Sequence, residues 1–125
     1  MAVLVLGVGN ILLSDEGIGV HVVNRLAARF HLPAGVEAVD GGTSGMDLLD
    51  AVAAAEAVVI VDCADLGAPP GTVREIVGEA VPAFFRTRIS PHQIGLSDLM
   101  GAVALLGRMP PRMALVAVQP ASLAL

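Results

Sequence analysis

The sequence predicts a single α/β domain with a largely parallel β-sheet. Apolar runs of strand length alternate along the chain with segments whose apolar residues recur at helical spacing. The 125 residues suffice for one domain but not for two, and no repeat, linker or low-complexity segment divides them. Crossovers between the parallel strands should be right-handed.

Five segments have strand character. Continuous apolar runs at residues 2–8 and 57–63 predict strands that are covered on both faces. A short strand is expected at 36–39 and a last strand at 112–118. Residues 72–77 alternate in polarity after a Gly/Pro-rich turn, which predicts an edge strand.

The first two helices are expected between these strands. One should run from about residue 16 to residue 30, and a second, capped by Thr43 or Ser44, should end near residue 52. The apolar face predicted for the first helix consists of Ile18, Val22, Leu26 and Phe30, with Val23 alongside.

The second half of the chain adds two helical segments. Residues 81–88 predict a short helical turn followed by a loop. Residues 91–106 predict a full helix, because apolar residues recur there at helical spacing. Its expected apolar face consists of Leu96, Leu99, Val103 and Leu106.

The composition excludes several classes of function. The chain is 55% hydrophobic but only 2% aromatic, its net charge is −5, and all its basic residues are Arg. Without a basic cluster or an aromatic platform, we expect no binding to nucleic acid and no polybasic membrane anchor. The apolar runs are too short to cross a membrane. A single cysteine and the lack of a signal peptide favour the cytoplasm.

Polar residues follow the predicted parallel strands, at the sheet edge where ligands of α/β proteins bind. The candidates there are Asn10, Asp15, Glu16, Asp40, Asp62, Cys63, Asp65, His92 and Gln93. Acidic residues at a helix start also complement the helix dipole, and an Asp after a strand also caps turns. Cys63 reads as a small buried apolar residue, and His21 and His31 as exposed polar residues.

His92 has a defined local setting. Ser90 fits the N-cap of the helix expected at 91–106, Pro91 fits the first helical position, and Gln93 completes a capping box. The helix dipole disfavours a protonated ring at this place, and a neutral imidazole is the form that binds metals or accepts protons. The alternative is an ordinary solvent-exposed side chain.

Glu16, Asp62 and His92 together offer two carboxylates and one imidazole. Such a set suits a divalent ion such as Ni²⁺ or Zn²⁺ with open coordination positions. The sequence contains neither an H-E-x-x-H nor a G-x-S-x-G pattern, so these motifs of zinc proteases and serine hydrolases are absent. The segment "GVGNIL" raises a nucleotide-binding alternative, but Leu12 stands where G-x-G-x-x-G needs its third glycine.

Four segments in this order resemble the nickel-iron hydrogenase maturation endopeptidases, particularly the hydrogenase-2 type. They are "VLGVGNILLSDEGIGV", "DGGTSGMDLL", "VVIVDCAD" and "ISPHQIGLSDLM". The resemblance implies a three-layer α/β/α sandwich with a five-stranded, mostly parallel sheet. It also implies removal of a C-terminal extension from the hydrogenase large-subunit precursor after nickel insertion, with Glu16, Asp62 and His92 as ligands of the precursor's nickel and the 40–43 loop beside that cleft.

The resemblance leaves two questions open. Nickel could serve catalysis, or it could only dock the precursor while Asp62, Glu16 or Asp40 acts as general base. Members of the family also continue into a closing C-terminal helix, which this sequence does not reach. We therefore expect residues 1–125 to be one C-terminally truncated domain with an apolar sheet face that promotes association, or a domain in which another subunit covers that face. A non-catalytic docking module for the nickel-loaded precursor is the alternative function.

Overall fold

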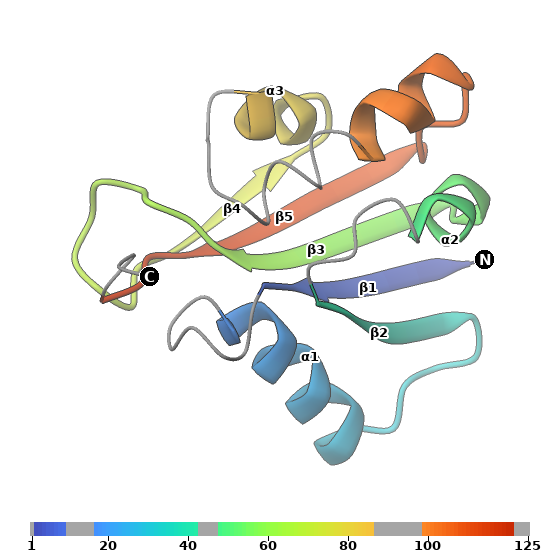
Figure 1. The fold of residues 1–125 in the computed structure, drawn as a ribbon. Helices are drawn as coiled ribbons and strands as arrows, with labels where there is room; N and C mark the ends of the chain where they lie inside the picture. The colour runs from blue at the N-terminus through green and yellow to red at the C-terminus, as the bar shows by residue number, and fades with distance from the viewer. Residues whose placement is uncertain (1, 10–16, 43–47, 87–98, 122–125) are drawn as a thin grey trace.

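The fold is described by a computed structural model, in which residues 2–9, 17–42, 48–86 and 99–121 are placed. Within these residues the structure contains a five-stranded sheet with helices on both faces (Figure 1). Helices of the described residues are all too short or too polar to cross a membrane.

The sheet has the strand order β2-β1-β3-β5-β4. Its strands are β1 (Val3–Val8), β2 (Val36–Gly42), β3 (Ala57–Cys63), β4 (Val73–Val77) and β5 (Arg112–Val118). All neighbouring strands are parallel except β4, which pairs antiparallel with β5 at the sheet edge. The predicted sheet and its edge strand are confirmed, and β2 extends three residues beyond the predicted strand at 36–39.

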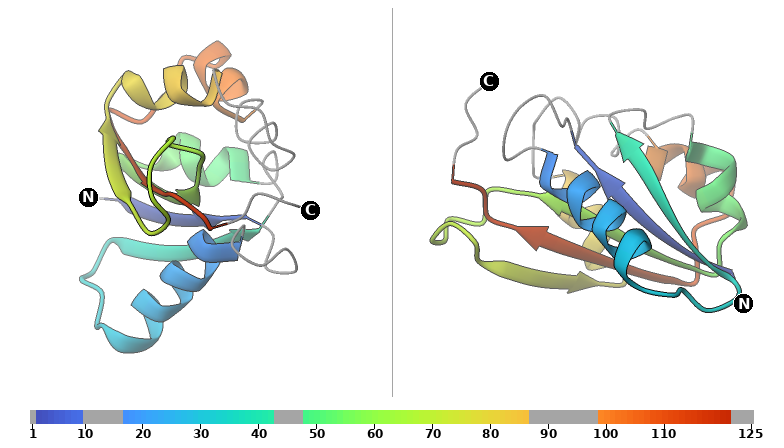
Figure 2. Two further views of the ribbon diagram at one scale, coloured as in Figure 1. Left: turned by 90° about the vertical axis from the view of Figure 1, so that its left-hand side faces the viewer. Right: turned by 90° about the horizontal axis from the view of Figure 1, so that it is seen from below.

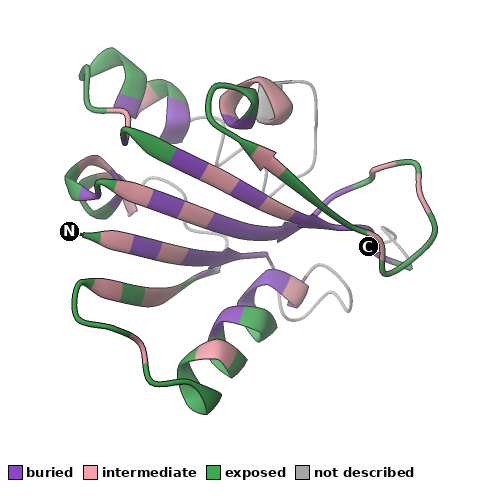
Figure 3. Ribbon diagram, turned by 180° about the vertical axis from the view of Figure 1, so that it is seen from behind, coloured by how far each residue is buried: buried purple, intermediate pink, exposed green. Residues whose placement is uncertain are grey.

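The apolar runs explain why β3 lies at the centre of the sheet. Successive side chains of a strand point to opposite faces, and along β3 and β5 buried residues alternate with half-buried ones (Figure 3). Leu6, Ile60 and Leu115 are fully buried on one face, where they form the centre of the core. The edge strand β4 is mostly exposed.

The helices form two layers on either side of this sheet. Helix α1 (Ile18–Arg29) covers one face, where it packs against β1, β2 and β3. Helices α2 (Leu49–Ala54) and α3 (Ala80–Arg86) lie on the other face together with the helical residues 99–105 (Figures 1 and 2). The three-layer α/β/α arrangement is therefore confirmed.

The face that α1 turns to the sheet differs from the predicted one. Gly19, Val20 and Val23 are its buried residues, whereas Val22 is 41% and Phe30 64% exposed. The helix carries apolar residues around much of its circumference, so spacing alone did not fix its rotation. Gly19 decides the rotation, because only a residue without a side chain can approach the strands so closely.

The remaining helices differ from expectation at their ends. Helix α3 is regular where a short turn and a loop were predicted; it begins two residues after Gly78, whose φ of 62° turns the chain. Val81 is then completely buried and fixes α3 to the core. Leu99 and Val103 are buried as predicted, but Leu106 lies beyond the helical residues and is 58% exposed. The predicted caps Thr43, Ser44 and Ser90 lie outside the described residues.

Candidate active site at the carboxyl edge of the sheet

Asp62 occupies the carboxyl end of the central strand β3. It pairs in register with Ala117 of β5, and its side chain is only 1% exposed. Carboxylates are rarely buried to this degree unless they are paired or bind a metal. Asp62 shares its face of the sheet with Val58 and Ile60, which is the face covered by α2, α3 and residues 99–105.

The start of α1 packs closely against the carboxyl edge of the sheet. A Cβ atom built on Gly7 of β1 would lie 2.4 Å from the Gly19 carbonyl oxygen. A Cβ built on Gly19 would lie 2.2 Å from the carbonyl oxygen of Val61, the residue before Asp62. These two glycines therefore let α1 begin beside the carboxyl ends of β1 and β3. The contact of Gly19 also explains the second glycine of "DEGIG", which is unfavourable for an ordinary first helical turn.

The end of β2 forms the other side of this edge. Asp40 is exposed and pairs in register with Gly7, so its carboxylate is not part of the buried core. Gly41 next to it is buried, and a Cβ there would lie 2.8 Å from Leu6 Cδ1. The glycine is needed for this close packing, whereas Asp40 stays accessible at the edge.

The loop after β3 is bound by a residue that the sequence analysis did not single out. Gln119, directly after β5, accepts a hydrogen bond from the Leu66 backbone N–H to its side-chain oxygen at 2.5 Å. Gln119 is only 9% exposed. A polar residue directly after the apolar run 113–118 was the only signal for it in the sequence.

Of the three predicted metal ligands, the described residues include Asp62 alone. Asp62 lies at the expected place, while Glu16 and His92 fall outside the described residues. Among the described residues, no three His, Cys, Asp or Glu side chains lie close enough together to hold a metal ion. The trio therefore stays a prediction. The other interpretations are confirmed where they can be seen: Cys63 is buried, and His21 and His31 are exposed.

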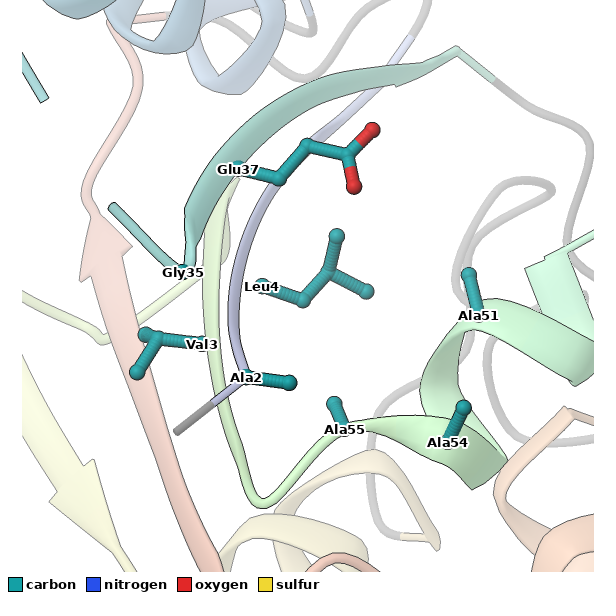
Figure 4. A pocket seen from close by; sticks show the side chains of 8 residues that line it. All are labelled: Ala2, Val3, Leu4, Gly35, Glu37, Ala51, Ala54 and Ala55. Carbon is teal, nitrogen blue, oxygen red and sulfur yellow. The ribbon is translucent and has the colours of Figure 1, made fainter. Parts of the chain in front are cut away.

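A pocket of about 200 Å³ lies at the opposite edge, between the amino ends of β1 and β2 and helix α2 (Figure 4). It is lined by Ala2, Val3, Leu4, Gly35, Glu37, Ala51, Ala54 and Ala55. Its walls are apolar apart from a single carboxylate, and Asp62 is at the other end of β3. This pocket does not carry the chemistry expected of the candidate site.

The fold and the buried Asp62 define an α/β sandwich whose candidate site lies at the carboxyl edge of a parallel sheet. The sequence profile of the hydrogenase maturation protease family matches residues 20–124, and the chain belongs to this family. It is therefore a peptidase by family, and the family assignment leaves the nucleotide-binding alternative without support.

Individual relatives agree with this assignment. The hydrogenase 2 maturation protease of Escherichia coli is 48% identical over 98% of this chain and 76% of its own length. The HupD hydrogenase expression/formation protein of Rhodobacter capsulatus is 44% identical over 97% of this chain, which spans only 58% of that relative.

Solved structures show the same fold. The hydrogenase maturating endopeptidase HybD from E. coli superposes with a TM-score of 0.93 at 47% identity, covering 99% of this chain and 77% of that one. The [NiFe] hydrogenase maturation protease HybD from Thermococcus kodakarensis gives a TM-score of 0.76 at 28% identity, covering 95% and 80%.

Proposed function

We propose that the protein removes the C-terminal extension from the large-subunit precursor of a nickel-iron hydrogenase after nickel has been inserted. Its family membership supports the endopeptidase reaction, and the relatives' names connect that reaction to hydrogenase maturation. The observation that carries the proposal is the buried carboxylate of Asp62 at the carboxyl end of β3. In this proposal nickel belongs to the substrate, and the reaction takes place in the cytoplasm.

Asp62 is proposed to meet the precursor's nickel together with Glu16 and His92. Two neighbours along the chain support this set. Gly17, which follows Glu16, is buried at the start of α1. It lies two residues before Gly19, which packs against the Val61 carbonyl. Leu99, seven residues after His92, lies in the same core cluster as Ile60, on the face of β3 that carries Asp62. Both arrangements favour convergence at one edge of the sheet.

The proposed chemistry divides between the substrate and the chain. Hydrolysis of a peptide bond needs an activated water and a polarised carbonyl group, both of which a divalent ion promotes. The carboxylates and the imidazole would hold the nickel-bearing segment of the precursor so that the scissile bond reaches this edge. A carboxylate that does not contact nickel would accept the proton of the attacking water; the exposed Asp40 is available for this role.

The test compares nickel-loaded with nickel-free precursor and follows the loss of the extension by mass spectrometry. Cleavage of the loaded form only is expected. Asp62→Asn and His92→Ala should each lower the cleavage rate about a hundredfold, because the loss of residues that only orient a metal ligand already costs about ten- to hundredfold. The matched controls are Asp50→Asn on α2 and His21→Ala on α1, both exposed, which should leave the rate unchanged.

Three results would contradict parts of the proposal. Equal cleavage of both precursor forms would remove nickel from recognition. Full activity of Asp62→Asn and His92→Ala would remove the trio from the site. Stable binding of loaded precursor that is never cut would instead support a docking module without catalysis.

A further inference from the structure

Gln119 connects the end of β5 to the loop that follows Asp62. Its side-chain oxygen accepts a hydrogen bond from Leu66 N–H at 2.5 Å, and its Nε2 donates to the Pro120 carbonyl at 3.3 Å. Its own backbone N–H donates to the Thr72 carbonyl at 2.8 Å, and its carbonyl accepts from Gly71 N–H at 2.9 Å. One residue therefore holds both the beginning and the end of the loop formed by residues 64–72.

The Gln119 side chain provides the hydrogen-bond acceptor that a backbone carbonyl would provide if the ladder between β3 and β5 continued. The ladder between β3 and β5 continues to Ala64, whose N–H donates to the Val118 carbonyl at 3.0 Å. The next hydrogen bond in this direction is the one from Leu66 to the Gln119 side chain. A partly buried N–H that loses its acceptor is costly, so the path of the chain leaving Asp62 depends on this amide.

The loop extends beyond the carboxyl ends of the strands (Figures 1 and 2). Asp65, Gly67, Pro69 and Pro70 are exposed along it. Local turns shape its interior: Gly67 N–H donates to the Asp65 carboxylate at 3.0 Å, and the Thr72 hydroxyl donates to the Pro69 carbonyl at 2.7 Å. The loop therefore lies at the same edge of the sheet as Asp62, two residues after it in the chain.

We propose that Gln119 is a positioning residue for the peptidase reaction, which fixes the 64–72 loop through the backbone of Leu66 and so shapes the surface that receives the precursor. The assignment rests on the proposed function. Asp62 itself is held by the ladder, since it pairs with Ala117 and Cys63 pairs with Val118. Loss of the Gln119 amide should therefore weaken precursor binding and leave the chemical step almost unchanged.

The test replaces the amide by side chains of similar size. Gln119→Met keeps length and volume but lacks a strong acceptor, whereas Gln119→Glu keeps an oxygen that accepts from Leu66 N–H. Gln119→Met removes both side-chain hydrogen bonds of Gln119. KM for nickel-loaded precursor should then rise about three- to tenfold at nearly constant kcat, which is the range for the loss of one or two hydrogen bonds. Amide hydrogen exchange of Leu66 should accelerate about tenfold. Gln119→Glu loses the donor to the Pro120 carbonyl but keeps an acceptor for Leu66 N–H. Both values should therefore stay closer to those of the unmodified protein than the values of Gln119→Met do.

Thr72→Val is the matched control, because it removes a hydrogen bond within the same loop but leaves the one to Leu66. It should not accelerate exchange at Leu66. Should Gln119→Met fail to fold, Gln119→Asn tests the same contact, since its amide is one methylene too short to reach Leu66.

The two proposals fail in different ways. If the unmodified protein cleaves the precursor but folded Gln119→Met shows the same KM, or the same exchange at Leu66, the positioning role is wrong. If Gln119→Met lowers kcat and leaves KM unchanged, the loop does not act on binding and the role is also wrong. If the unmodified protein cuts no precursor, the proposed function fails, and the role of Gln119 in it fails as well.

Discussion

Gly19 of α1 packs directly against the main chain of Val61 in β3. A Cβ on Gly19 would lie 2.2 Å from the Val61 carbonyl oxygen and 2.4 Å from that of Val8. Distances below 3.0 Å do not occur for real Cβ atoms, so any side chain here would push α1 away from the sheet. The contact joins the start of α1 to the residue before Asp62, and it therefore links the stability of the fold to the geometry of the candidate site.

Replacing Gly19 by alanine should destabilise the protein and reduce its activity together. The added methyl group meets backbone atoms rather than flexible side chains, so the helix itself must move. We expect the free energy of unfolding to fall by about 3 kcal/mol, at the upper end of the usual cost of overpacking. Urea denaturation gives this value, and cleavage of nickel-loaded precursor should slow because the start of α1 shifts relative to Val61 and Asp62.

Gly101→Ala is the matched control for this substitution. Gly101 lies among the helical residues 99–105, and nothing comes within 4 Å of a Cβ built on it. Alanine there should raise the free energy of unfolding by about 0.5–1 kcal/mol, because glycine is unfavourable inside a helix. Similar unfolding energies for the two variants would show that the close contact at Gly19 is not what holds α1.

Nickel binding by the chain alone should depend on Asp62 and on pH. If Glu16, Asp62 and His92 face the ion, Asp62→Asn should weaken Ni²⁺ binding about tenfold or more in calorimetric titrations. Affinity should fall as the pH is lowered, because protons compete with nickel for the imidazole and the carboxylates. Asp50→Asn, which changes an exposed carboxylate on α2, should bind nickel as the unmodified protein does. A Ni²⁺ affinity that does not change with pH would exclude the imidazole of His92 from the ligands.

Much of the fold follows from patterns that are local in the sequence. The strands at 57–63 and 112–118 have the predicted bounds, because apolar runs of this length form strands of a sheet. The rotation of α1 could not be predicted, because apolar residues lie on several sides of the helix. Its sheet-facing side is decided by the close contact of Gly19 with β3, which is a tertiary contact.

The candidate site shows the same division. Asp62 was predictable, because a polar residue at the end of an apolar strand falls at the carboxyl edge of a parallel sheet. Gln119 was not, because its partner Leu66 lies 53 positions away and no spacing rule connects them. Residues that act through the backbone of a distant loop leave no motif of their own.

The sheet face beside α1 carries a strip of apolar residues, which is interrupted by the exposed Glu75 between Val73 and Val77. The apolar members of the strip are Val59, Val73, Val77, Ala114 and Val116. Val73 and Val77 are 61% and 57% exposed, and the other three are half-buried. Strand register places all five on the face of α1, but α1 packs against β1, β2 and β3 rather than against β4. Such apolar strips favour association, so the 125-residue chain should self-associate as its concentration rises in sedimentation velocity runs.

The double variant Val73→Thr/Val77→Thr should weaken this association. Threonine keeps the β-branched shape that suits a strand but adds a hydroxyl to the strip. The dissociation constant of the oligomer should rise at least about tenfold, since each contact would lose four apolar side chains. Leu105→Gln is the control, because Leu105 is 91% exposed but lies among the helical residues of the other face. If Leu105→Gln weakened association as strongly as the double variant, the contact would not involve the strip.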